Sequence, residues 1–262
     1  GSVLKPILLS SAIDNNIFDP DIPIEIPRRL KINDKIISDY KSYEELTPKQ
    51  VIAYSSQVGA SKIAIMLGYE KLKDAYYNFG FGKPISINFP SSAFGLMNIK
   101  DKISDKELAS LGYGYGLTIS PFQITSAYSV FANKGIYKDF KILKSDEVGL
   151  HRVISEDSAK HTLEALKEVV HIGTGKNADI NGYTEGGKTG TVHKTSYGNG
   201  YAEDSYRASF VGIAPLSDKS LTIFVSIDEP GLNAYSGGMI AAPLFKKIAD
   251  SSLNYLGYSE DE

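Results

Sequence analysis

The sequence predicts an α+β fold in which helices cover a mostly antiparallel sheet. Apolar residues recur at helical spacing in several segments between residues 2 and 170. From about residue 183 their period changes to two, and the last segment, 241–256, returns to helical spacing. Helices, then strands, then one helix that must cover the sheet form an order typical of this fold class.

The helical block is predicted from apolar periodicity and from capping residues. A first helix covers Ser2 to Ile13, and the prolines from Pro20 to Pro27 then require extended or looping chain. Thr47-Pro48 and Ser120-Pro121 each place a capping hydroxyl before a proline at the first helical position. We expect helices over 47–54, 58–67, 69–79, 120–133 and 155–170, and a long surface loop over 81–118.

Strand-like segments follow around 183–193, 206–214 and 219–228, with the segment at 209–213 among the clearest. We expect one domain over residues 1–262, with an all-helical part to about residue 180. The sheet and its closing helix are expected over about 181–258.

Composition excludes several classes of function. The 262 residues carry a net charge of −3 with scattered Lys and Arg, so we expect no nucleic-acid partner. The chain has no cysteine, which removes thiolate metal sites, and its four histidines are not spaced as in a zinc enzyme, so we expect no zinc site. No apolar run reaches the roughly 18 residues of a membrane span. A nucleophile here would need a base other than a standard histidine triad.

Two glycine-rich segments resemble nucleotide-binding loops. Gly182 to Thr189 matches GxxxxGK[ST], but a phosphate loop lies between a strand and a helix, and here β-prone residues follow. The 74 residues after Lys188 are too few for a parallel NTPase sheet. Gly173 to Ala178 follows a helix, so we interpret it as a helix-ending turn and expect no nucleotide partner.

Ser2 and Lys5 have the spacing SxxK, which places them on one face of a helix. A serine hydroxyl needs a base, and an amine acts as one only when neutral. Lowering the lysine pKa from near ~10.4 to near ~7 requires about 4–5 kcal/mol, which burial and a second cation such as Lys188 could supply. Ser38 to Lys41 also matches SxxK and is interpreted as a solvated turn. As an alternative, the Gly-Ser start could be a cloning scar, in which case Ser2 has no role.

Two further motifs carry polar groups. In the strand Lys188-Thr189-Gly190-Thr191, alternation puts Lys188 and Gly190 on one face and the threonines on the other, unless the strand twists at the glycine. Such a strand could add an extended peptide at its edge while Lys188 and a hydroxyl hold a carboxylate. Ser55-Ser56-Gln57 offers a hydroxyl and a carboxamide at a helix junction, which by itself could be simple capping.

The order of the three motifs is that of the serine penicillin-recognising enzymes: SxxK, Ser-x-amide 53 residues later, and KTG 133 residues after that. Residues 46–67, 111–137 and 188–191 resemble the transpeptidase domain of class B penicillin-binding proteins of the septal, cell-division type. Residues 235–245 also resemble that family's last strand-to-helix loop. Two departures are Gln57, where the family usually has Asn, and a start at SxxK, which leaves out the family's N-terminal strands and would expose a sheet edge.

The resemblance implies a peptidoglycan D,D-transpeptidase that β-lactams inhibit and that needs no metal and no organic cofactor. It implies that Ser2 attacks the penultimate D-Ala carbonyl of a stem peptide, that Lys5 is the base, and that Ser55 relays protons with help from Lys188. Gln57 would orient the donor amide, while Lys188, Thr189 and Thr191 would hold the terminal carboxylate beside Gly190. The backbone N–H groups of Ser2 and Thr191 would form the oxyanion hole.

The implied partners are the D-Ala-D-Ala stem peptide, β-lactams and, for the parent protein, other division proteins. The implied location is the periplasm, at the extracytoplasmic face of the membrane, with the anchor outside this chain. Two alternatives stay open: a β-lactamase or D,D-carboxypeptidase that uses the same motifs, and a non-catalytic division scaffold.

Overall fold

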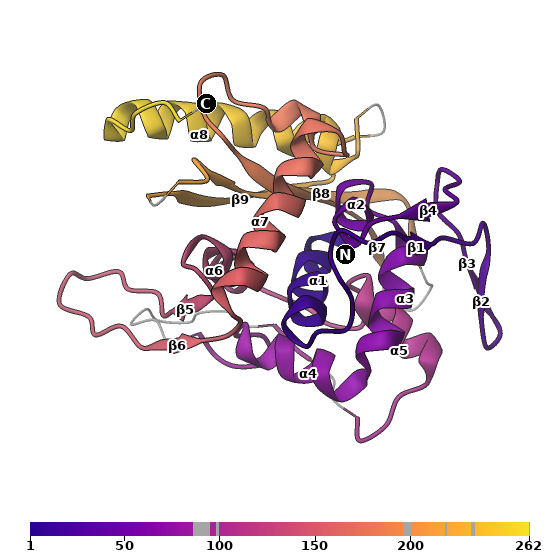
Figure 1. The fold of residues 1–262 in the computed structure, drawn as a ribbon. Coiled ribbons are helices and arrows are strands. Elements are labelled where there is room, and N and C mark those ends of the chain that lie inside the picture. The colour runs from indigo at the N-terminus through magenta and orange to yellow at the C-terminus, as the bar shows by residue number, and fades with distance from the viewer. Residues whose placement is uncertain (86–94, 98–99, 196–200, 218, 232–233, 262) are drawn as a thin grey trace.

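A three-stranded antiparallel sheet forms the centre of the molecule in the computed structural model, which describes residues 1–262 except 86–94, 98–99, 196–200, 218, 232–233 and 262 (Figure 1). Its strands are β7 (Gly186–Thr195), β8 (Tyr201–Ala214) and β9 (Leu221–Asp228), in the order β7-β8-β9. The three predicted strands are confirmed, and β8 begins earlier than expected. In the described part of the chain, no strand pairs with β9 on its outer side.

The two faces of the sheet are covered by different helices, as the alternation along β8 requires. Phe210 packs against Phe245 of α8 (Ala242–Leu256), which follows a π-helical turn, η3 (Gly237–Ala241), and covers one face (Figure 1). Val211 and Ile213 belong to the core on the opposite face, which the helical part of the chain covers. The α+β class predicted from the sequence is therefore observed.

Helix α1 lies in the interior of this helical part and brings a lysine into it. The chain enters it through a 3-10 turn, η1 (Ser2–Leu4), and α1 itself covers Lys5–Asp14. Every side chain from Lys5 to Ile13 is buried, as expected for a helix surrounded by neighbours on all sides. The remaining helices of this part are α2 (Pro48–Ala53), α3 (Gln57–Leu67), α4 (Tyr69–Asn78), α5 (Asp105–Gly112), α6 (Pro121–Ala132) and α7 (Glu156–His171), and a 3-10 turn, η2 (Lys176–Ala178), follows them.

The helix starts follow the predicted capping residues. Thr47 and Ser120 each accept a hydrogen bond from the backbone three residues on, and the glutamine there reaches back to complete a capping box. The predicted long loop over 81–118 is wrong at α5. A third capping box, formed by Ser104 and Glu107, starts that helix, and this pair of residues is the feature of the sequence that indicates it. Residues 86–94 and 98–99 of the predicted loop lie outside the described residues.

The helical part also contains short antiparallel pairs of strands, which the sequence analysis did not predict. They are β1 (Ile24–Glu25) with β4 (Glu45–Leu46), β2 (Leu30–Ile32) with β3 (Lys35–Ile37), and β5 (Ile136–Lys138) with β6 (Leu150–Arg152). Strands of two or three residues are too short for a period of two to be recognised.

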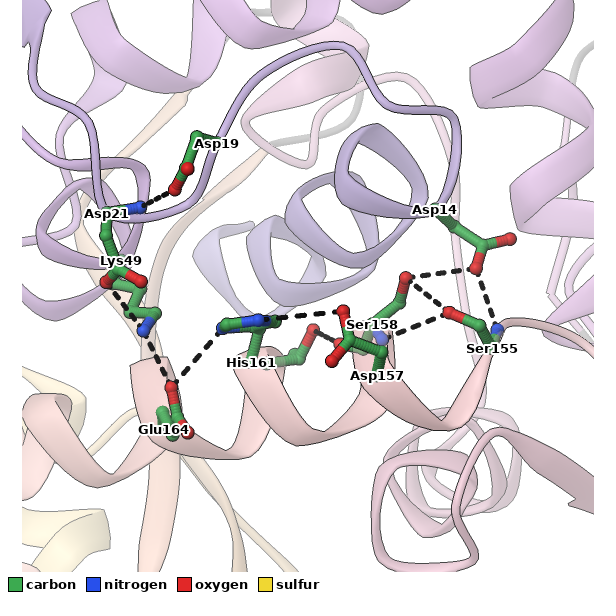
Figure 2. A network of polar contacts seen from close by, with 10 residues as sticks. Asp14, Asp19, Asp21, Lys49, Ser155, Asp157, Ser158, His161 and Glu164 are labelled. Atoms are coloured by element: carbon green, nitrogen blue, oxygen red, sulfur yellow. Dashed lines mark hydrogen bonds and ion pairs between the residues drawn. The ribbon is translucent and has the colours of Figure 1, made fainter.

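Polar contacts fasten α7 beside α1 and α2 (Figure 2). Asp14, at the end of α1, accepts hydrogen bonds from the Ser155 backbone N–H (2.7 Å) and the Ser158 hydroxyl (3.0 Å) at the start of α7. Further along α7, Glu164 accepts from Lys49 of α2 at 2.6 Å, and Lys49 also pairs with Asp21 at 2.7 Å. These contacts fix the position of α7 relative to α2. The C-terminal ends of these two helices border the cleft described below.

Among the residues that the structure describes, none of the helices combines the length and the apolar character needed to cross a membrane.

Candidate active site

The three sequence motifs meet in one cleft of about 890 Å³. Its lining comes from η1, residues 39–43, the α2–α3 junction, strand β7, the turn after α7 and the loop before α8. The predicted site residues on its surface are Ser2, Ser55, Gln57, Thr189 and Thr191. Lys5 and Lys188 are both fully buried.

The sequence predicts Lys5 as the base, and the surroundings of its amine are compatible with that role. Its ammonium nitrogen donates to the Ser55 carbonyl (2.6 Å) and lies 3.2 Å from the Ser55 hydroxyl. Burial lowers the pKa of Lys5 from 10.5 to about 7, although the negative charge of Asp39 opposes the shift. A substantial fraction of this amine is therefore neutral near pH 7, and a neutral amine can accept a proton.

Ser2 is the first residue of η1, one turn before Lys5, and lines the cleft. Side chains at i and i+3 of a 3-10 turn eclipse each other, so Ser2 and Lys5 lie on the same side of the chain. The buried Tyr128 hydroxyl donates to the Val3 carbonyl at 2.7 Å, which anchors this turn. The turn thus places a half-buried serine that lines the cleft on the same side of the chain as the buried lysine.

Ser55 connects α2 to α3 with a left-handed backbone, φ 58°. The capping interpretation is correct for its neighbour Ser56, whose oxygen accepts from the Gly59 N–H at 2.8 Å. The Ser55 hydroxyl instead faces the Lys5 amine. The side chain of Gln57 is exposed and lines the cleft.

Asp39 supports this junction and was missed by the sequence analysis. Its carboxylate accepts from the Ser56 hydroxyl and the Gln57 N–H, each at 2.5 Å, and from the Val58 N–H at 3.2 Å. Asp39 belongs to the second SxxK match, Ser38 to Lys41, where the other residues are exposed as predicted for a solvated turn. A carboxylate at the N-terminus of α3 stabilises the free N–H groups there.

The KTG strand has the predicted alternation. A Cβ atom at Gly190 would lie 3.0 Å from a Val3 methyl group, so Gly190 faces η1, and Thr189 and Thr191 line the cleft. The Lys188 amine is near the Thr189 carbonyl (3.3 Å) and hydroxyl (3.4 Å). Burial, followed by the positive charge of Lys5, lowers the pKa of Lys188 well below its ordinary value.

The loop before α8, which ends in the π-helical turn η3, packs directly on this strand. A Cβ atom at Gly237 would lie 2.5 Å from the Gly190 carbonyl oxygen, so only glycine fits this close approach. The Gly237 N–H donates to the Thr191 hydroxyl at 3.0 Å. This loop therefore fixes the orientation of one of the two threonines that the sequence assigned to substrate binding.

The turn after α7 is a further wall of the cleft. The prediction that Gly173 to Ala178 ends a helix is confirmed, because α7 stops at His171 and the chain turns. The turn also brings Thr174 to the cleft, with its hydroxyl 2.9 Å from the Thr189 hydroxyl. Nothing in the sequence around Thr174 indicated this contact.

Tyrosines stand at both sides of the cleft. Tyr43 and Tyr54 stack with ring centroids 5.4 Å apart, and Tyr235 stacks on Tyr206 at 4.5 Å. Tyr43, Tyr54 and Tyr235 line the cleft. Flat aromatic faces beside a polar floor suit a peptide or a ring-containing ligand.

The GK[ST] segment lies inside β7 rather than in a loop before a helix, and Lys188 is fully buried there. It therefore lacks the setting of a phosphate-binding loop. Within the described residues there is no group of three or more His, Cys, Asp or Glu side chains that could hold a metal ion.

Comparisons with known proteins agree with this geometry. Residues 1–250 match the family described as penicillin binding protein transpeptidase domain. The chain is 34% identical over 264 residues to the probable peptidoglycan D,D-transpeptidase PbpC of Pseudomonas aeruginosa, covering 100% of this chain and 46% of that protein. It is 32% identical over 264 residues to the peptidoglycan D,D-transpeptidase FtsI of Escherichia coli, covering 100% of this chain and 44% of that protein. The chain thus spans about half the length of these curated relatives.

Solved structures give the same result. The transpeptidase domain of penicillin-binding protein 3 from Burkholderia pseudomallei superposes with a TM-score of 0.93 at 32% identity, covering 100% of this chain and 80% of that one. Penicillin-binding protein 3 from Mycobacterium tuberculosis, complexed with aztreonam, superposes with a TM-score of 0.91 at 27% identity, covering 100% and 63%. From its sequence, its fold and its cleft, this chain belongs to the penicillin-binding protein transpeptidase domain family.

Proposed function

We propose that this chain is a serine D,D-transpeptidase domain that cross-links peptidoglycan stem peptides through an acyl-serine intermediate. The observation that carries the proposal is the Lys5 amine, which is buried, has a pKa near 7 and is bonded to Ser55. This amine lies one turn from Ser2, in a cleft that the KTG strand borders.

In the acylation step, Ser2 Oγ attacks the carbonyl carbon of the penultimate D-Ala and passes its proton to Lys5. The backbone N–H groups of Ser2 and Thr191 stabilise the oxyanion. When the C–N bond breaks, the Ser55 hydroxyl delivers a proton to the departing D-Ala amine and is reprotonated by Lys5. This route is supported by the 3.2 Å separation of Lys5 Nζ from Ser55 Oγ.

The donor peptide binds along the edge of β7. Its terminal carboxylate accepts from the Thr189 and Thr191 hydroxyls, with the Lys188 amine behind them. Gly190 leaves the strand free to approach η1, and the Gln57 carboxamide orients the donor amide from the opposite wall. Gln57 is one methylene longer than the usual Asn, so its amide reaches further into the cleft.

The acceptor is an amine of a second stem peptide, and hydrolysis is slow. A β-lactamase needs a group that activates water. Of the cleft-lining residues, Asp39 carries a carboxylate, which is already occupied by Ser56 and two backbone N–H groups. This arrangement favours transpeptidation over the β-lactamase alternative.

The resemblance to septal class B enzymes supports a role in septal wall synthesis. We assign residues 1–262 to one domain, with a helical part to about residue 180 and the sheet with its closing helix over about 181–258. Because peptidoglycan lies outside the cytoplasmic membrane, we assign the domain to the periplasm at the extracytoplasmic face of the membrane. Other division proteins are then expected to bind the longer protein of which it is part.

Labelling with a fluorescent penicillin, followed by mass spectrometric mapping of the adduct, tests the proposal. We expect one adduct, on the peptide that contains Ser2, and we expect it to persist for hours. Ser2→Ala should abolish the label, whereas Ser38→Ala, in the exposed second SxxK match, should keep it.

Two results would favour the alternatives. Folded wild-type protein that takes no label would indicate a non-catalytic scaffold. An adduct that disappears within minutes would indicate a β-lactamase or a carboxypeptidase that activates water.

A further inference from the structure

The turn that follows α7 contacts three other parts of the fold that border the cleft. The Thr174 backbone N–H donates to the Ala53 carbonyl at the end of α2, at 3.1 Å. The Asn177 amide donates to the Gly238 carbonyl in the loop before α8, at 2.8 Å. The Thr174 hydroxyl lies 2.9 Å from the Thr189 hydroxyl of β7. These contacts hold the Thr174 side chain at a fixed place beside the KTG strand.

The hydrogen-bond capacity of Thr189 gives this contact a direction. A threonine hydroxyl has one donor hydrogen and two acceptor lone pairs. Lys188 Nζ, at 3.4 Å, donates to one lone pair, since an amine keeps at least two N–H donors in either protonation state. If the Thr174 hydroxyl donates to the other, both lone pairs are used, and the hydrogen of Thr189 must point to a third partner. The cleft is the open direction.

We propose that Thr174 is a positioning residue that orients the Thr189 hydroxyl toward the terminal carboxylate of the donor. This inference rests on the proposed function and adds a residue from outside its three motifs. Thr174 donates to Thr189, and Thr189 donates to the carboxylate, so that each hydroxyl polarises the next. Thr174 acts on recognition of the carboxylate and leaves the Ser2–Lys5 chemistry unchanged.

Substitution at Thr174 can be tested without disturbing the fold. Its side chain is exposed in the cleft, and valine has nearly the same shape, so Thr174→Val removes the hydroxyl but keeps the backbone bond to Ala53. Thr174→Ser restores the hydroxyl. Thr125→Val is the matched control, because the Thr125 hydroxyl donates to the Pro121 carbonyl within α6 and the residue does not line the cleft.

The measurement is the second-order rate constant of acylation by benzylpenicillin and by its methyl ester, which lacks the free carboxylate. Without the Thr174 hydroxyl, the Thr189 hydroxyl can turn away from the carboxylate. Losing that one hydrogen bond to a charged group slows a reaction about tenfold or more. We expect Thr174→Val to slow acylation by the acid about tenfold and by the ester less than about twofold. Thr174→Ser and Thr125→Val should keep the wild-type ratio of the two rate constants.

Three outcomes separate the possible failures. If Thr174→Val keeps the wild-type ratio of acid to ester, the inference is wrong. If it slows both reagents equally, Thr174 has a merely structural role, and the inference is again wrong. If wild-type protein reacts with neither reagent, the proposed function itself fails.

Discussion

At the scale of single residues, the reactivity of the site depends on where Lys5 is buried. A lysine on a solvated helix keeps its proton at neutral pH, whereas burial on α1 lowers the pKa of Lys5 to about 7. We therefore predict that the acylation rate of Ser2 by penicillin rises with pH and levels off with a midpoint near pH 7. Stopped-flow measurement of acylation from pH 5 to 9 tests this, and a midpoint near 10 would contradict it.

The same group links folding stability to pH with a defined sign. The folded-state pKa of Lys5 lies below the ordinary value of 10.5, so the unfolded chain binds more protons between about pH 7 and 10.5. The contribution of Lys5 to the free energy of unfolding therefore becomes less unfavourable as the pH rises through this window. Lys5→Met removes the buried amine, so it should abolish acylation at every pH and flatten this part of the stability profile.

The sequence predicts Ser2, Lys5, Ser55 and the KTG strand as site residues because each motif joins reactive groups at short, recognisable spacings. Asp39 and Thr174 could not be predicted in this way. Each acts on a group 15 or more residues away, Asp39 on Ser56 and Thr174 on Thr189. Their positions depend on how loops pack, which local spacing does not encode.

At the scale of secondary-structure elements, helices α2 and α7 form a pair whose ends carry the site. The C-terminal end of α2 leads into Ser55, and the turn after α7 carries Thr174. Between them, Lys49 is held by Asp21 and Glu164 (Figure 2). Burial alone would lower the pKa of Lys49, but hydrogen bonds to both carboxylates outweigh it and raise the pKa.

We predict that Lys49→Met lowers the free energy of unfolding by about 1 kcal/mol, because its side chain is buried while its partners remain partly hydrated. Lys73→Met is the matched control, since the Lys73–Glu70 pair lies within one turn of α4, and it should lower the free energy of unfolding less than Lys49→Met does. Urea unfolding at pH 7 compares the two variants. Equal losses would contradict the prediction.

The acid dependence of the Lys49 effect provides a second check. Burial would raise the pKa of Glu164, but the hydrogen bond and charge of Lys49 outweigh it and lower the pKa. The pair therefore contributes fully above the ordinary pKa of a glutamate and is lost as the pH falls through the lowered one. The difference in free energy of unfolding between wild type and Lys49→Met should therefore become smaller as the pH falls through the lowered pKa of Glu164.

Element boundaries were predicted well where a cap marked them and poorly where tertiary packing did. Helices α2 and α6 start at the predicted Thr47 and Ser120 caps. The hairpin of β2 and β3 turns through Asn33, whose φ is 53°, and its three-residue strands leave no periodic signal. Such strands form because flanking elements hold them in place.

At the scale of the whole molecule, the cleft lies where separate parts of the fold meet. Ser2 belongs to η1 and Ser55 to the α2–α3 junction, both in the helical part, whereas Thr189 and Thr191 belong to the sheet. An acyl group on Ser2 that contacts both Ser55 and the threonines adds interactions between these parts. A ligand that binds the folded state in preference to the unfolded state stabilises the folded state.

We predict that acylation by penicillin raises the Tm of the chain by at least about 3 °C, since about 1 kcal/mol corresponds to a shift of about 2–4 °C in a domain of this size. Ser2→Ala should show no shift at the same penicillin concentration, and penicillin already hydrolysed to its acid should leave wild type unchanged. Differential scanning calorimetry makes the comparison. A mass-verified acyl-enzyme with an unchanged Tm would mean that the acyl group contacts the helical part alone, and the assignment of Thr189 and Thr191 to its carboxylate would be wrong.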